Sequence, residues 1–496
     1  MGKKRTIYFN DARHYYLFVF EPPMTMEDAW LPIDEVSGTG IDTFVYGASR
    51  VDGLFYPSKA GTQFKHGEHG VDSPGFKQNA YWRLWHNMKS LEDRGLDVLQ
   101  VLIDRAHEKG MDFFSSLRLS EYTTMDPAYR TREGGGGWAH KEVRDYQLNV
   151  LREMAVDYNT EGIELDFAAG PGGSPPMFPD SDTAQKNTST MTEWVASVGE
   201  MVHGRTGTPG EVGARVYPTE KMNLESGFDV RQWIKDGSVD FVVPMLYGHM
   251  LIDTGSDISW LVNAANESSA SVYAILQPHY TDDNSGRRSG RGNATTEMLR
   301  AAATAYLDQG ADGTYAWFLP WPVKESGRSI LSEMADRDRM VEGDKHYVAS
   351  RATEISKRVG LETDLPIEIE ATDVGTPYET RLYVSDDIAV KSDRVQQVTL
   401  RLFINDVVSE DKFTFTLNGT SLAGESLRRY SDEDRAPYWG QWLEFDLKQV
   451  HPQKGWNTLT VVLDGRPTDL ISSVVVEDVE LIIKYGHYPA KLDYSP

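Results

Sequence analysis

The stretch GIELDF at residues 162–167 is the strongest indication of the fold. Successive side chains of a β-strand point to opposite faces, so Glu164 and Asp166 share one face while the three apolar residues share the other. An apolar face that packs on helices, opposite two inward carboxylates, is typical of a strand in a parallel barrel. Burying carboxylates is costly unless they are paired or used in chemistry. The stretch therefore predicts a barrel strand that carries functional residues.

Seven further β-rich runs accompany this strand, and longer helical patterns separate them. The runs cover residues 5–9, 41–46, 111–119, 213–217, 239–246, 271–276 and 313–318. Eight strands with intervening helices are the count of a closed (β/α)8 barrel, the TIM barrel. An open doubly wound sheet is the alternative, but no glycine-rich phosphate loop follows any run. We expect an α/β barrel catalytic domain over residues 1–345.

The pattern changes after Trp321, where residues 330–345 are typical of a closing helix and a linker. The chain then becomes rich in short alternating strands, expected at residues 398–403, 413–417, 442–447, 458–463 and 474–485. Turns such as Asn418-Gly419 separate them, which predicts an all-β, jelly-roll-like sandwich within residues 346–496. Because no lectin signature is visible, this domain is expected to buttress the barrel, with glycan binding as the alternative.

Composition excludes several classes of function. A formal net charge of −25 argues against a basic nucleic-acid-binding surface. The absence of cysteine excludes disulfides, thiolate metal sites and a cysteine nucleophile. No apolar run is long enough to predict a membrane span, and no pattern requires a metal or a cofactor.

The beginning of the chain bears on localisation. Its basic residues are followed by a segment that Asn10, Asp11, Arg13 and His14 interrupt, which predicts a strand rather than the apolar core of a signal peptide. The acidic surface suits a bacterium from a saline or marine environment. We expect a secreted or periplasmic protein whose signal peptide is not part of this chain, with a cytoplasmic protein as the alternative.

Polar and aromatic residues gather at the carboxyl ends of the predicted strands, where barrel enzymes have their active sites. Those expected to bind substrate are His14, Tyr46, Arg118, Glu164, Arg215, Tyr247, Gln277, His279 and Trp317. The aromatic rings suit stacking on sugar faces, or else they pack the rim of the barrel. The two arginines suit an anionic substituent, or they neutralise the buried carboxylates, which is the favoured interpretation.

Asp166 and Glu220 are the predicted catalytic residues. Hydrolysis of a glycosidic bond needs two carboxylates, and adjacent strand ends can hold them at the separation of a retaining or of an inverting enzyme. We expect Asp166 as nucleophile or general base, and a half-buried Glu220 with a raised pKa as general acid. Asp166 is otherwise a buried partner of an arginine, and Glu220 a loop or helix-capping acid. Glu121 and Asp11 are the reserve carboxylates.

Several segments carry a resemblance to a known family. They are GIELDF at 162–167, Met191-Thr192, ARV at 214–216, FDV at 228–230, Trp233-Ile234, VDFVVP at 239–244, LSEM at 331–334 and DKHY at 344–347. Together they resemble bacterial glycosidase-like barrel proteins, often called family 10-type glycosylhydrolase-like proteins, which continue into a C-terminal β domain. The resemblance implies a glycosidase barrel, a polysaccharide substrate and Asp166 as the leading catalytic acid. Where such relatives often have arginine or other polar residues, residues 168–170 are Ala-Ala-Gly, so the sugar subsites are expected to differ.

We therefore expect a glycoside hydrolase with a two-carboxylate mechanism that acts on a polysaccharide or oligosaccharide, including an anionic, sulfated or uronate-bearing one. One alternative is a barrel that binds glycan without turnover. Another is a polysaccharide lyase with Tyr247 or His279 as its base. Two carboxylates within about 10 Å of each other would favour the hydrolase, whereas one carboxylate facing a Tyr/His pair would favour the lyase.

Overall fold

The computed structural model describes residues 3–11, 16–50, 53–65, 78–119, 127–129, 137–158, 160–168, 176–280, 292–317, 319, 322–433 and 439–486. The chain divides into two compact units. The first comprises Met1–His249, Ile258–Ile275 and Gly310–Ala335, and the second comprises Met250–Asp257, Leu276–Gln309 and Asp336–Pro496. Among the described residues, no helix is long and apolar enough to cross a membrane.

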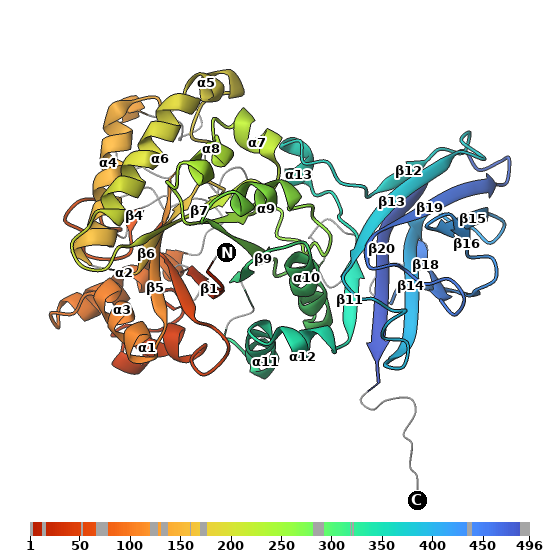
Figure 1. Ribbon diagram of the computed structural model, residues 1–496, viewed down its shortest axis with the longest axis horizontal. Helices are drawn as coiled ribbons and strands as arrows, with labels where there is room; N and C mark the ends of the chain where they lie inside the picture. The colour runs from red at the N-terminus through yellow and green to blue at the C-terminus, as the bar shows by residue number, and fades with distance from the viewer. Residues whose placement is uncertain are drawn as a thin grey trace, which may run out of the picture. The chain divides into compact units, whose positions relative to one another are not determined.

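A closed barrel of parallel strands forms the centre of the first unit (Figure 1). Its strands are β1 (Thr6–Asp11), β2 (Thr43–Gly47), β5 (Asp112–Arg118), β6 (Gly162–Asp166), β7 (Glu211–Val216), β8 (Phe241–Pro244), β9 (Ser271–Leu276) and β10 (Gly313–Trp317). Their order around the barrel is β1-β10-β9-β8-β7-β6-β5-β2, and a short hairpin of β3 (Ser49–Arg50) and β4 (Gly53–Leu54) follows β2. The predicted eight-stranded barrel is confirmed.

Helices connect successive strands. They are α1 (Met26–Asp34), α2 (Gln78–Glu92), α3 (Val98–Glu108), α4 (Lys141–Arg152), α5 (Ser181–Lys186), α6 (Thr188–His203), α7 (Glu220–Glu225), α8 (Val230–Lys235), α9 (Ser259–Asn266) and α10 (Thr296–Asp308), followed by α11 (Glu325–Met334), α12 (Arg337–Val341) and α13 (Glu354–Arg358). Side-chain caps begin many of them: Asp97 accepts hydrogen bonds from two backbone N–H groups at the start of α3.

Aromatic rings fill the barrel interior, and glycines on neighbouring strands make room for them. A Cβ atom on Gly162 would lie 2.3 Å from Cε1 of Phe114, and one on Gly213 would lie 2.0 Å from Cζ of Phe241. The two phenylalanine rings pack edge to face, with centroids 5.6 Å apart. The barrel is therefore a packed core below the carboxyl ends of its strands.

An acidic residue directly before every second strand fixes the register at the amino end of the barrel. The carboxylates of Asp42, Glu161, Asp240 and Asp312 accept hydrogen bonds from the backbone N–H groups of Thr6, Phe113, Val212 and Val272, at 3.1, 2.8, 2.6 and 3.0 Å. In each pair the backbone N–H of the acidic residue donates in return to the carbonyl oxygen of its partner. This repeated double contact joins neighbouring strands at the end opposite the carboxyl ends, where barrels build stability rather than catalysis.

The second unit contains two antiparallel sheets. One has the order β11 (Lys345–Val348), β20 (Val474–Tyr485), β14 (Val395–Asn405), β18 (Gly440–Asp446) and β17 (Ser426–Ser431), with β12 (Ile367–Ile369) also paired to β20. The other has the order β13 (Pro377–Val384), β19 (Gly455–Gly465), β15 (Lys412–Leu417) and β16 (Thr420–Ser421). Buried side chains such as Leu400, Leu443 and Val461 form its core, which confirms the predicted all-β domain.

Candidate active site

Charged side chains lie at the carboxyl ends of three neighbouring barrel strands. In the register of β5, β6 and β7, Arg118 pairs with Asp166, and Asp166 pairs with Arg215. The row below contains Ser116 and Glu164, which are partners in the same register. The strand alternation inferred from GIELDF is correct, because Glu164 and Asp166 lie on one face and contact the same arginine.

Arg215 joins the two carboxylates of β6. Its Nε lies 2.9 Å from Oε1 of Glu164, its Nη2 lies 2.8 Å from Oδ2 of Asp166, and all three side chains have no exposed surface. The hydroxyl of Ser116 donates a hydrogen bond to Glu164 at 2.7 Å and accepts one from Arg215 at 3.0 Å. Arg215 thus neutralises buried carboxylates, the favoured one of its two predicted roles.

Arg118 connects Asp166 to a third carboxylate. Its Nη2 donates to Oδ2 of Asp11 at 2.9 Å, and its Nε lies 3.7 Å from Oδ2 of Asp166. Because both contact one guanidinium group, these two carboxylate oxygens are at most about 9 Å apart, within the range of glycosidase carboxylate pairs. We call Asp11, Arg118, Glu164, Asp166 and Arg215 the carboxylate–guanidinium cluster.

The electrostatics of the cluster differ between its members. Burial raises the pKa of Glu164, and the charge of Arg215 offsets this only in part. Oδ2 of Asp166 contacts two guanidinium groups, whereas its buried Oδ1 accepts no hydrogen bond from the described part of the chain. Asp166 therefore has one oxygen held by guanidinium groups and one buried oxygen without a described hydrogen-bond donor at the end of β6.

Aromatic side chains pack beside the cluster. The guanidinium of Arg118 lies 4.9 Å from the ring centroid of Tyr247, and its Nη2 lies 3.4 Å from the tyrosine hydroxyl. Tyr247 in turn packs edge to face on Trp317, the last residue of β10, with centroids 5.3 Å apart. The structure thus brings two predicted substrate-binding aromatics to the cluster.

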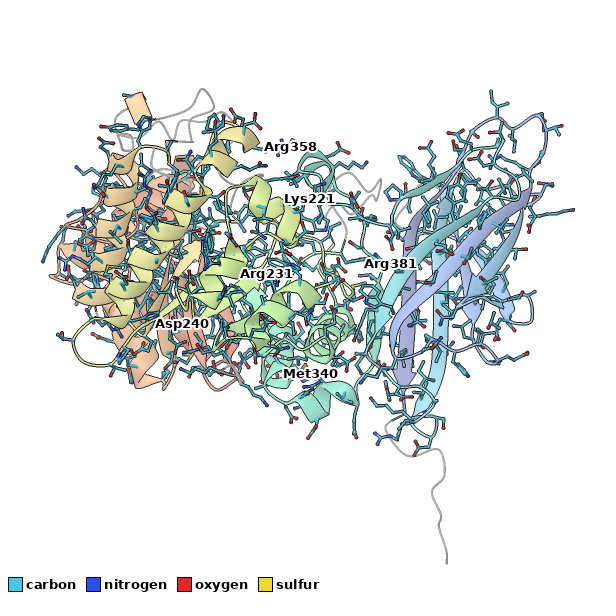
Figure 2. All side chains as sticks on the ribbon, turned by 45° about the horizontal axis from the view of Figure 1, so that its top comes forward. Lys221, Arg231, Asp240, Met340, Arg358 and Arg381 are labelled. Carbon is cyan, nitrogen blue, oxygen red and sulfur yellow. The ribbon has the colours of Figure 1, made fainter. Side chains whose placement is uncertain are left out.

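Glu220 has a different environment from the one predicted. It is the first residue of α7, its side chain is 39% exposed, and its two oxygens lie 2.7 and 2.9 Å from the guanidinium of Arg231 on α8. Figure 2 labels Arg231 and also Lys221, the residue that follows Glu220. This contact lowers the pKa of Glu220. The predicted raised pKa is therefore wrong. Glu220 lies beyond the end of β7, in a turn where Thr219 caps the helix, and strand alternation no longer determines where its side chain points.

Tyr46 is a core residue. Its ring lies 6.3 Å from that of Phe113, and the adjacent Phe114 faces the barrel interior, so Tyr46 lies on the helix-facing side of the barrel wall. Its side chain is fully buried. The packing alternative from the sequence therefore describes Tyr46 better than the sugar-stacking one.

The remaining predicted substrate-binding residues follow strands β9 and β1 in the sequence. Gln277 and His279 follow β9 and belong to the second unit, where Gln277 is buried and His279 forms backbone bridges with Leu251 and Asn293. His14 lies outside the described residues, as does the reserve carboxylate Glu121.

Ser116 also contacts the cluster, and it was not among the residues predicted from the sequence. Ser116 is two residues before Arg118 on β5, so the same alternation that places Arg118 inside the barrel could have found it. Among the residues that the structure describes, no group of three histidine, aspartate or glutamate side chains is arranged to hold a metal ion.

The site belongs to a (β/α)8 barrel with a buried carboxylate–guanidinium cluster at its carboxyl end. No family model matches the chain, and no curated protein matches it. The resemblance to family 10-type proteins therefore stays a prediction.

Solved structures show only distant likeness. An α-L-fucosidase from Vibrio sp. strain EJY3 shares 10% identity over 96% of this chain and 96% of that one, with a TM-score of 0.39. A putative α-L-fucosidase from Bacteroides thetaiotaomicron shares 10% identity over 98% and 96%, with a TM-score of 0.39. The chitinase ChiW from Paenibacillus sp. str. FPU-7 shares 11% identity over 95% of this chain and 56% of that one, with a TM-score of 0.41. Likeness at this level assigns neither a family nor an activity.

Proposed function

We propose that this protein is a glycoside hydrolase whose barrel cleaves a polysaccharide or oligosaccharide, with Asp166 as the central carboxylate. The buried Oδ1 of Asp166, which accepts no hydrogen bond from the described residues, carries the proposal. Two guanidinium groups contact its other oxygen and hold the carboxylate in place, which suits a nucleophile or general base. Asp166 also lies at the carboxyl end of a barrel strand, where the catalytic residues of this architecture are found.

Asp11 is the best-supported second carboxylate. It shares Arg118 with Asp166, and their separation suits a two-carboxylate mechanism. As the second carboxylate, Asp11 would be the general acid that protonates the leaving oxygen. Glu220 is less suitable, because Arg231 stabilises its ionised form.

The cluster supports a neutral sugar over an anionic one. Arg118 and Arg215 are both engaged by carboxylates, so a sulfate or uronate would have to compete with Asp11, Glu164 or Asp166 for them. The contact between Arg118 and the hydroxyl of Tyr247 keeps the lyase as a second candidate, because a positioned tyrosine hydroxyl can act as a general base.

The test is release of reducing sugar from neutral, uronate-bearing and sulfated polysaccharides. We expect the wild type to act on a neutral polysaccharide, and Asp166→Asn and Asp11→Asn each to lower the rate by about 100-fold or more. Glu220→Gln should retain activity. Glu211→Gln, which changes a carboxylate paired with Arg5 at the amino end of the barrel, is the matched control and should also retain it.

Two outcomes would contradict the hydrolase proposal. One is no release from any polysaccharide by folded wild-type protein. The other is undiminished release by an Asp166→Asn variant whose circular dichroism matches the wild type. Unsaturated products, detected by ultraviolet absorbance and lost in Tyr247→Phe, would favour the lyase instead.

A further inference from the structure

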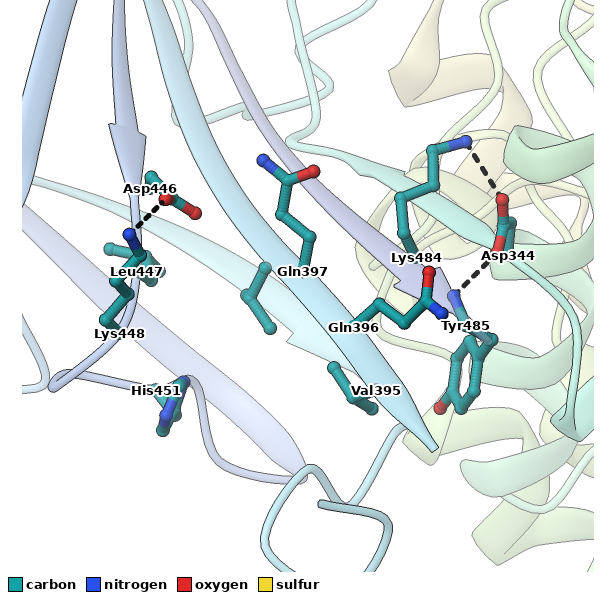
Figure 3. A pocket seen from close by; sticks show the side chains of 11 residues that line it. Asp344, Val395, Gln396, Gln397, Asp446, Leu447, Lys448, His451, Lys484 and Tyr485 are labelled. Carbon is teal, nitrogen blue, oxygen red and sulfur yellow. Dashed lines mark hydrogen bonds and ion pairs between the residues drawn. The ribbon is translucent and has the colours of Figure 1, made fainter. Parts of the chain in front are cut away.

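A groove of about 710 Å³ lies on the second unit, where β14 begins and β18 and β20 end (Figure 3). Its polar lining includes Gln396, Gln397, Asp446, Lys448, His451 and Lys484. Every residue that lines it belongs to the second unit, so the groove is separate from the carboxylate–guanidinium cluster.

A β-bulge exposes two consecutive glutamines in this groove. Val395 pairs with Tyr485 and Gln397 pairs with Lys484, which leaves Gln396 as an extra residue in β14. In a regular strand one of two consecutive side chains would face the sandwich core, as the next residue of β14 does. The bulge instead leaves both amides exposed and in the groove. Bulges that redirect side chains are frequent beside functional sites.

Charges in the groove are balanced. Lys448 forms an ion pair with Asp446 at 3.1 Å, and Lys484 forms one with Asp344 at 3.0 Å. Figure 3 shows these pairs on opposite sides of the two glutamines. Each cation has a carboxylate beside it, so the groove presents many hydrogen-bonding groups without a strong field of one sign. Such a surface favours a neutral polar ligand over an anion or a cation.

One wall of the groove is held in place by a single carboxylate. Glu425 accepts hydrogen bonds from the backbone N–H groups of Lys448, Gln449 and Val450, at 2.9, 2.8 and 2.7 Å. These contacts fix the segment that carries Lys448 before any ligand binds. A fixed wall reduces the entropy lost on binding.

The facing wall is fixed as well. The backbone N–H of Tyr485 donates to Asp344 at 2.7 Å, and its hydroxyl donates to Asp386 at 2.6 Å. Both walls are thus held by hydrogen bonds within the protein. Sites for small molecules are usually preformed in this way.

We propose that this groove binds a neutral oligosaccharide segment, in addition to the sugar site proposed for the barrel. Amides and paired charged groups match the alternating donors and acceptors of sugar hydroxyls. The partly buried Val395 adds apolar surface for the C–H face of a sugar ring. The volume lies within the range of small-ligand sites and suits a short oligosaccharide. The second unit thereby has a binding role beyond the buttressing expected from its sequence.

The test is native affinity electrophoresis of the full chain in gels that contain hydroxyethylcellulose, xylan, galactomannan, laminarin, or acidic alginate. We expect at least one neutral polysaccharide to retard the wild type. The double variant Gln396→Ala/Gln397→Ala should bind it at least about fivefold more weakly. Gln453→Ala, which removes an exposed glutamine outside the groove lining, is the matched control and should migrate like the wild type.

Three results would overturn the groove proposal. They are no retardation of the wild type by any neutral polysaccharide, equal retardation of the folded double variant, and retardation by alginate alone. Circular dichroism of the variants checks their fold. The test measures binding only, so its failure is distinguishable from failure of the hydrolase proposal, which rests on product release.

Discussion

Arg215→Met tests whether the guanidinium of Arg215 supports the two carboxylates of β6. The wild-type side chain is fully buried and lies 2.9 Å from Glu164 and 2.8 Å from Asp166. Methionine keeps much of the length of the side chain but removes the charge. Breaking a buried ion pair by removing one partner costs about 3–5 kcal/mol, because it leaves buried charge uncompensated.

The loss of stability in Arg215→Met should depend on pH in a defined direction. Burial already raises the pKa of Glu164, with Arg215 opposing the shift, so the substitution should raise this pKa further. A carboxyl group whose pKa is higher in the folded protein than in the unfolded chain destabilises the fold as pH rises through that range. The loss of stability should therefore be largest at about pH 8 and should shrink toward about pH 5.

Urea unfolding followed by circular dichroism measures the effect at both pH values. Arg231→Met is the matched control, because its guanidinium pairs with the partly exposed Glu220. Exposed pairs contribute about 0–1 kcal/mol. If Arg215→Met lost no more stability than this control, or lost as much at acidic as at alkaline pH, Arg215 would not be the counter-charge of the β6 carboxylates.

Three further substitutions test the surrounding structure. The hydrogen bond to Asp240 raises the pKa of His203, so its contribution is present below the unfolded pKa and lost as pH rises through the folded one. His203→Gln should thus cost about 0.5 kcal/mol near pH 6 and less near pH 9 in urea unfolding. Gly213→Ala places a Cβ atom 2.0 Å from the ring of Phe241 and should cost about 1–3 kcal/mol in the same assay. Tyr46→Phe should leave reducing-sugar release unchanged, and a large loss would show that Tyr46 contacts substrate.

Strand alternation explains why much of the barrel site was predictable from sequence. The period of two places Glu164, Asp166 and Arg215 inside the barrel without any knowledge of tertiary contacts. The same rule assigns Tyr46 to the helix-facing side of the barrel wall. Its predicted contact with sugar rested only on its position near the end of a strand. Periodicity locates side chains within strands and gives no information beyond them.

The environment of Glu220 was predicted wrongly for a different reason. Its side chain is oriented by Arg231, on the following helix, and the sequence around Glu220 does not predict that ion pair. The reserve position of Asp11 had a similar cause, because its contact with Arg118 joins β1 to β5, and β2 lies between these two strands. Which carboxylates share a guanidinium therefore depends on the order of the strands in the sheet, which no single segment of sequence contains.

The carboxylates and guanidinium groups of the cluster affect both its stability and its proposed chemistry. Among the described residues, three carboxylates, Asp11, Glu164 and Asp166, contact two guanidinium groups, Arg118 and Arg215. Burial is the largest cause of the raised pKa of Glu164, and the charge of Asp166 adds to it. A fold selected for stability alone would gain by replacing one of the acids with an apolar or amide side chain. Glycoside hydrolysis passes through a transition state with positive charge on the sugar ring, which a fixed excess of negative charge stabilises. The carboxylates of the cluster therefore suit the reaction proposed for it.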